Sequence, residues 1–206
     1  MNTNFFKTRK LFLKLALLLS FSLSVTNCSK DSDLVTKPSA VLAPLQDPLP
    51  GYLAASGFNQ KTANIDGNFF YSEVGFSFIP LLNGKMTAIV VKIPYARLGI
   101  RVTVWDKVAG TIIRTETIDL ETAGVEVTKQ ITTLDLVKDK EYFITMLSNC
   151  SYFRSKTNNT TVTYPFTVGD FKITTCSYRD GTAQTMMPNT PVFNGYSGDC
   201  SFKFQK

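Results

Sequence analysis

Acidic side chains are the residues with which this chain could most readily catalyse a reaction. The chain contains no histidine, which excludes Ser-His-Asp and Cys-His nucleophiles and the zinc sites that depend on imidazole. It has neither a phosphate-binding P-loop nor a dinucleotide-binding glycine motif. Glycoside hydrolysis needs only two carboxylates a few ångströms apart, and candidates are Glu73, Asp106, Glu116 and Glu141. Sequence spacing does not show whether two of them face each other in the fold. A structural or solvated role is the alternative for each.

Aromatic side chains beside polar ones are the second set of interest. Exposed Trp and Tyr rings can stack on the apolar faces of sugar rings while polar neighbours bond the hydroxyl groups. Trp105 is followed directly by Asp106, and Tyr152 and Arg154 lie in a Ser/Asn-rich stretch that is typical of a loop. Together with Glu73, they form the predicted ligand-binding set. The alternative is that the large rings are buried or close one end of the fold. Further tyrosines near turns are Tyr164, Tyr178 and Tyr196.

Two loops carry side-chain oxygens of the kind that bind calcium, at residues 64–68 and at Asp180-Gly181. Asp-Gly and Asn-Gly are also common turn residues, so a turn without metal is the alternative. A structural calcium is therefore the one cofactor considered, and no motif indicates another.

Three cysteines follow the N-terminal region: Cys150, Cys176 and Cys200. In an oxidising compartment we expect one disulfide, which leaves the third thiol unpaired. Cys150 and Cys176 each fall near the end of a predicted strand, and this favours their pairing. Three reduced, buried thiols are the alternative.

The first 27 residues have the pattern of a secretory signal peptide, because basic residues precede an apolar run, residues 15–25, that is too short to cross a bilayer. Cys28 follows in a context that resembles the lipobox of bacterial lipoproteins, although Asn27 stands where a small residue is usual. The resemblance implies that Cys28 carries the lipid after cleavage. Residues 29–33 resemble tracts that direct lipoproteins to the outer face of the outer membrane. An ordinary cysteine and a solvated linker are the respective alternatives.

Net charge argues against a nucleic-acid partner. The whole chain has 22 basic and 16 acidic residues, and removing the four basic residues of the signal leaves 18 against 16. A nucleic-acid surface needs clustered Lys and Arg, and the remaining sequence has no such cluster. The expected partners are the membrane, through the lipid anchor, and a polysaccharide or an envelope protein.

Residues 28–50 are expected to form the lipidated N-terminus and an extended spacer. Prolines recur there without helical or strand periodicity, and each proline fixes φ and removes a backbone donor. Residues 51–206 are expected to form one domain, because no repeat or second linker interrupts them and their length supports a single core.

The domain sequence alternates between apolar and polar residues with a period of two, which is typical of strands with one buried face. Clear examples are residues 74–78, 87–93, 100–104 and 200–204. Trp105 falls on the face opposite the apolar stripe that precedes it. Turn residues separate these stretches at short intervals, and no helical pattern lies between them. The sequence predicts an all-β fold, a single antiparallel β-sandwich.

The region from Glu73 to about Phe153 resembles a bacterial surface β-sandwich family of unassigned function, whose members occur alone or attached to cell-wall and carbohydrate-acting proteins. The stretches that carry the resemblance are 73–78 (EVGFSF), 84–89 (GKMTAI), 102–106 (VTVWD), 110–114 (GTIIR) and 138–144 (KDKEYFI). The resemblance implies a jelly-roll-like sandwich and a carbohydrate-binding role. It supplies no catalytic residues.

These features predict a non-catalytic lipoprotein of the outer membrane, facing the cell surface, that binds a glycan or a protein. A structural or adhesion component that assembles with other envelope proteins is the alternative. A carboxylate-dependent glycosidase is the third hypothesis, with Glu73 as its first candidate residue.

Overall fold

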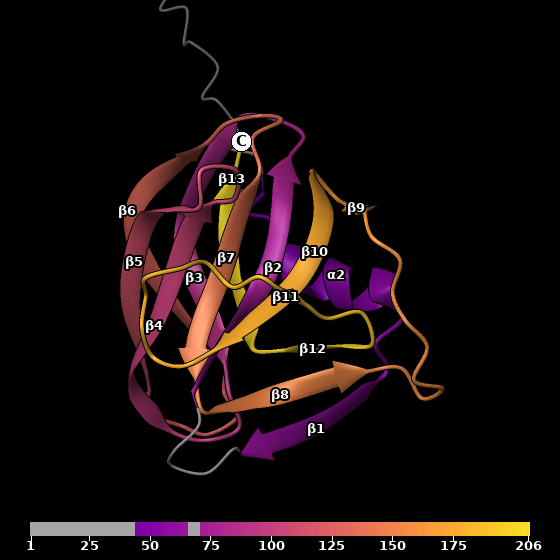
Figure 1. Cartoon of the computed structure of the whole chain (residues 1–206). Coiled ribbons are helices and arrows are strands. Elements are labelled where there is room, and N and C mark those ends of the chain that lie inside the picture. The colour runs from indigo at the N-terminus through magenta and orange to yellow at the C-terminus, as the bar shows by residue number, and fades with distance from the viewer. Residues whose placement is uncertain (1–43, 66–70) are drawn as a thin grey trace, which may run out of the picture. The chain divides into compact units, whose positions relative to one another are not determined.

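The structure, a computed structural model, describes residues 44–65 and 71–206, which form one compact unit (Figure 1). Within those ranges there is one helix, α2 (Pro48–Ser56). The strands in chain order are β1 (Gln60–Ile65), β2 (Ser72–Pro80), β3 (Gly84–Lys92), β4 (Arg97–Asp106), β5 (Thr111–Leu120), β6 (Val127–Leu136), β7 (Tyr142–Ser148), β8 (Cys150–Ser155), β9 (Phe166–Val168), β10 (Phe171–Asp180), β11 (Thr190–Pro191), β12 (Gly195–Ser197) and β13 (Asp199–Gln205).

The strands form two packed sheets and one additional sheet. The large sheet has the order β11-β10-β2-β7-β4-β5, with β9 also paired to β10, and the small sheet has the order β13-β3-β6. A third sheet, β1-β8-β12, lies across one end of the other two and is called the end sheet below (Figure 1). All of the pairings are antiparallel.

The strand pairs are nested along the chain. β4 pairs with its neighbour β5, β3 pairs with β6, and β2 pairs with β7. The outermost pair joins Gln46 to Phe204 of β13 through two backbone hydrogen bonds of 2.9 and 2.8 Å. A long antiparallel hairpin whose paired strands fold over into two packed sheets is a jelly roll. In this protein β10 is added to the large sheet beside β2. The predicted antiparallel β-sandwich is confirmed.

The core lies between the large and small sheets, where alternate side chains of both point inward. On β13, Cys200, Phe202 and Phe204 are fully buried, as the period-two pattern predicts. The rings of Phe78 on β2 and Phe202 meet across the core with centroids 4.6 Å apart. Burial of each such large apolar side chain contributes about 1.5–3 kcal/mol, which makes this interface the main source of stability.

Helix α2 begins and ends at well-defined caps. The side chain of Asp47 accepts a hydrogen bond from the backbone N–H of Leu49 at 3.0 Å, and Pro48 follows at the start of the helix, where no N–H donor is needed. Gly57 ends the helix with a φ of 74°, a left-handed conformation that favours glycine. Tyr52 is fully buried and fixes the helix to the core.

The expected boundary between an extended spacer (28–50) and a domain (51–206) falls inside α2. Gln46 bridges to β13, and the carboxylate of Asp47 accepts a hydrogen bond from the Lys203 ammonium at 3.0 Å. The end of the expected spacer is thus helical and packed. Its prolines start a helix here because a capping residue precedes them.

Candidate ligand-binding site

Trp105 and Glu73 lie on the outer face of the large sheet, where the sequence places them, but both are buried. Trp105 is 1% exposed and Glu73 is 3% exposed. The indole Nε1 donates to Glu73 Oε1 at 3.3 Å and to Thr145 Oγ1 at 3.0 Å, and the Thr145 hydroxyl donates to the same carboxylate at 2.5 Å. Arg101 completes the group with an Nη2–Oε2 ion pair to Glu73 of 3.0 Å.

Residues 181–189, which join β10 to β11, cross this outer face and are called the covering segment (Figure 1). The Gln184 amide donates to the hydroxyls of Thr103 and Thr115 at 2.7 and 2.8 Å, and Arg101 donates to the Thr182 carbonyl at 3.0 Å. A sugar can stack on Trp105 only if the indole ring is exposed, and this ring is buried. The expectation of a ligand-binding role for Trp105 and Glu73 is therefore corrected to a structural one.

Asp106 holds a turn. Its Oδ1 accepts hydrogen bonds from the backbone N–H groups of Val108 and Ala109 at 3.1 and 2.9 Å, and its Oδ2 pairs with the Lys140 ammonium at 2.8 Å. The Ala109 N–H and then Lys140 lower the pKa of Asp106 from its ordinary value. This carboxylate orders the β4–β5 turn.

The other predicted carboxylates also have separate partners. Glu116 accepts from the Lys129 ammonium at 3.0 Å, and Glu141 accepts from the Thr174 hydroxyl at 2.5 Å. Each carboxylate is thus bound in its own local contact, and nothing in their hydrogen bonding brings two of them together as the pair that glycoside hydrolysis requires.

Tyr152 and Arg154 lie on β8 and not in a loop. The Tyr152 ring is flanked by Lys61 Nζ, 4.6 Å from its centroid, and by the Arg154 guanidinium at 5.6 Å. Arg154 forms a two-pronged ion pair with the buried Asp199, in which the Nε–Oδ1 distance is 2.9 Å. The Arg154 guanidinium is therefore occupied by an internal partner.

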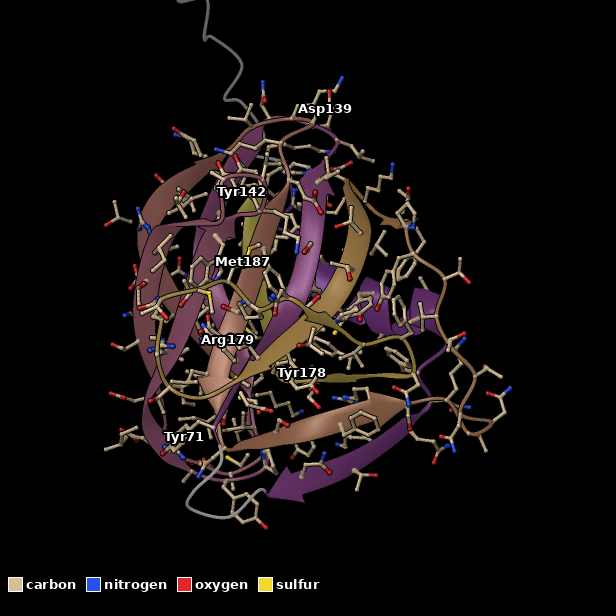
Figure 2. The ribbon with its side chains drawn as sticks, in the orientation of Figure 1. Tyr71, Asp139, Tyr142, Tyr178, Arg179 and Met187 are labelled. Atoms are coloured by element: carbon tan, nitrogen blue, oxygen red, sulfur yellow. The ribbon has the colours of Figure 1, made fainter. Side chains whose placement is uncertain are left out.

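A pocket of about 240 Å³ opens between the end sheet and the inner side of the large sheet. β8, β1 and β12 form one wall, and the ends of β2, β7 and β10 form the other, with Tyr178 on β10 visible near the end sheet in Figure 2. We call it the inter-sheet pocket. It is lined by Asn64, Ser72, Val74, Ser148, Ser151, Phe153, Tyr178, Val192 and Ser197.

Some polar side chains of this pocket already form hydrogen bonds within the protein, and the others are available to a ligand. Ser148 donates to the Cys150 carbonyl at 2.5 Å, and Ser72 donates to the Asp180 carboxylate at 2.6 Å. Four other polar side chains have no hydrogen-bond partner among the residues that the structure describes. These are Asn64, Ser151, Tyr178 and Ser197.

Strand pairing brings the available groups together. Asn64 is the partner of Ser151 in the β1–β8 register, and Ser197 is the partner of Phe153 in the β8–β12 register. Gly195 makes room for the Phe153 ring, because a Cβ there would lie 2.3 Å from the ring's Cζ. The result is a wall that carries two hydroxyls and an amide beside one aromatic ring.

A second pocket, of about 170 Å³, lies between α2 and β13 and contains charged groups. Its two buried or half-buried acids are already neutralised, Asp199 by Arg154 and Asp47 by Lys203 at 3.0 Å. The inter-sheet pocket, in contrast, has no Asp, Glu, Lys or Arg among the described residues of its lining.

The three cysteines are free and buried, so the expected Cys150–Cys176 disulfide is corrected. Cys150 begins β8 in the end sheet and contacts the Ser148 hydroxyl, whereas Cys176 lies on β10 in the core. Burial raises the pKa of Cys176 to about 12, which keeps it a neutral thiol.

Cys28, the signal peptide predicted at 1–27 and the loop residues 66–68 lie outside the described residues. Asp180, from the second predicted calcium loop, bonds Ser72. Within the described ranges, no cluster of three or more His, Cys, Asp or Glu side chains is arranged to hold a metal. No helix of that same part of the chain is long and apolar enough to cross a membrane.

Comparison with protein-family models and with curated proteins gives no match to this chain.

Proposed function

We propose that this chain is a non-catalytic lipoprotein of the cell envelope whose sandwich binds carbohydrate in the inter-sheet pocket. The observation that carries the proposal is the set of unpartnered hydroxyl and amide groups beside aromatic rings in a pocket whose described lining residues are uncharged. A sugar presents hydroxyl groups that both donate and accept, and C–H faces that pack on aromatic rings.

The available side chains complement such a ligand. Asn64 can donate and accept through its amide, and the hydroxyls of Ser151 and Ser197 can do either. Phe153 and Tyr178 supply apolar ring surface. Each neutral hydrogen bond contributes about 0.5–1.5 kcal/mol net, so a few of them give the modest affinity expected of a surface module.

The absence of catalysis is part of the proposal. Of the residues that the structure describes, none in the pocket lining is an acid or a base of the kind that cleaves a glycosidic bond. Glu73, the first candidate for that role, is held by Arg101 and Trp105 beneath the covering segment.

The experiment that tests carbohydrate binding is a glycan-array screen with the purified protein, followed by titration of each hit. We expect Ser151→Ala and Tyr178→Phe to weaken binding by about three- to tenfold, because each removes one hydroxyl. Ser155→Ala is the matched control on the same strand, outside the lining, and it should leave the affinity unchanged. A folded protein that binds no glycan would overturn the proposal and direct the search to protein partners.

The membrane anchor is a second element of the proposal and is supported by the sequence around Cys28. Residues 29–43 separate this cysteine from the first described residue. Two or more acyl chains at one residue give stable attachment, whereas one chain binds only weakly. Cys28→Ala should release the protein from the membrane fraction and abolish incorporation of labelled fatty acid. Retention of both in the variant would overturn the anchor.

A further inference from the structure

The inter-sheet pocket is small for a ligand site. Its volume of about 240 Å³ lies below the range of about 300–1,000 Å³ typical of pockets for drug-sized molecules. A ligand of the size of one sugar ring fills such a space. Two linked rings exceed it, so any further rings of a glycan lie outside the pocket.

Backbone connections border the pocket at two corners. β7 turns into β8 through Asn149 alone, and both Ser148 and Ser151, on either side of this corner, line the pocket. At the other side, Val192 lines the pocket from the connection between β11 and β12, and Ser197 lines it from the end of β12. Figure 1 shows these corners at opposite ends of the end sheet. A glycan that ran through the pocket from corner to corner would have to cross the protein backbone.

The lining favours an uncharged ring. Among the residues that the structure describes, none in the lining carries a charge that could neutralise an acidic sugar. The Asp180 carboxylate, behind Ser72 at 2.6 Å, adds a negative charge on one side. Because an ion without a partner is costly to remove from water, a uronic acid is excluded more strongly than a neutral hexose.

We propose that the inter-sheet pocket receives a single neutral sugar ring at the end of a glycan chain, so that the protein binds chain ends and not internal runs. This inference rests on the proposed carbohydrate function. It adds that recognition is end-on, that one ring carries the affinity, and that a negative charge at that ring weakens binding.

Isothermal titration of the purified protein with glucose, galactose, mannose and N-acetylglucosamine, and with their linear oligomers of two, four and six rings, tests the inference. For the sugar that binds, we expect the Kd per chain to change by less than about threefold between one and six rings. The matching uronic acid should bind at least about tenfold more weakly. Ser151→Ala should weaken the monosaccharide and the hexamer by the same factor, and Ser155→Ala should weaken neither.

Two results would overturn end-on recognition while the carbohydrate function stands. One is a Kd that tightens tenfold or more with chain length. The other is a hexamer blocked at both terminal rings that binds as well as the free hexamer. If no monosaccharide and no glycan of any length binds the folded protein, the carbohydrate function itself fails, and the end-on inference fails with it.

Discussion

The indole nitrogen of Trp105 on β4 donates a hydrogen bond to the carboxylate of Glu73 on β2 across the intervening strand β7. Both side chains are buried on the outer face of the sandwich, where a solvated surface is usual for an antiparallel sheet. Of the described side chains, the buried atoms without a partner are Ser77 Oγ and Arg101 Nε, and both belong to strands of this same sheet. The covering segment therefore buries a set of polar side chains on the outer face of the large sheet, separate from the apolar core.

Removal of the Glu73 carboxylate should be strongly destabilising. Glu73→Ala leaves the Arg101 guanidinium without its carboxylate partner and removes one of the two acceptors of the Trp105 N–H. Loss of one partner of a buried ion pair costs about 3–5 kcal/mol. Urea unfolding followed by circular dichroism measures the change. Glu121→Ala, at an exposed position, is the control and should stay within about 0.5 kcal/mol of the parent. A Glu73→Ala midpoint equal to that of the control would contradict the structural role.

The covering segment should open when its anchor is removed. Gln184→Ala deletes the hydrogen bonds to Thr103 and Thr115, at a cost of about 1–2 kcal/mol, while the core is untouched. Trp105 is the only tryptophan in the chain, so its fluorescence reports on this region alone. We expect stronger acrylamide quenching in Gln184→Ala. Thr185→Ala, at an exposed position of the same segment, should leave quenching unchanged.

Period-two alternation predicts which face of a strand a residue occupies, and it does so correctly for Val102, Val104 and Trp105. It does not predict what lies over that face. Trp105 is buried by residues 181–189, about 80 positions later in the chain, whose irregular sequence has no period. An exposed aromatic ring was therefore a reasonable expectation from local pattern and wrong in the folded chain.

The residues that line the inter-sheet pocket form no sequence pattern that predicts a binding site. Ser151 and Ser197 are small polar residues of the kind that occur throughout surface loops, and they meet only because β8 pairs with β1 on one side and β12 on the other. Tyr178 stands out in the sequence only as a tyrosine near a turn. Helix α2 was missed, because the prolines of residues 28–50 favoured an extended spacer, although Asp47-Pro48 and Gly57 are recognisable start and stop signals.

Alkaline pH should destabilise the fold through its buried thiols. Below pH 9 both the folded and the unfolded chain keep the Cys176 proton, but between pH 9 and about 12 only the unfolded chain releases it. Stability therefore falls as the pH rises through this window, by about 1.4 kcal/mol per pH unit for such a group. Urea unfolding at pH 7, 9 and 10 measures the slope, and Cys176→Ala should flatten it. An equal slope in parent and variant would contradict this assignment.

The same thiols should be unreactive in the native protein. A thiol reagent added at pH 8 should label Cys150, Cys176 and Cys200 only after unfolding, because all three are free and buried. Intact mass before and after reduction provides the control. A shift of two mass units on reduction would indicate a disulfide and contradict the structure.

The segment before α2 should be required for full stability. A chain that begins at Gly51 lacks the bridge of Gln46 to Phe204 and the contacts of Asp47 with Lys203 and with the helix start. We expect it to unfold at least about 2 kcal/mol more easily than a chain that begins at Leu42. Asp47→Ala in the longer chain should account for part of the loss. Equal midpoints for the two chains would show that residues 44–50 do not contribute.

The bonds between Gln46 and Phe204 also determine when the fold can be completed. β13 follows the other described strands in the chain, and it covers Phe78 and its neighbours at the edge of the small sheet. If the chain is secreted N-terminus first, as the proposed lipid anchor requires, the hydrophobic interior stays open until β13 has emerged. Such a chain remains unfolded while it is threaded through a translocation channel, and its slow, long-range strand pairing is deferred to the far side of the membrane.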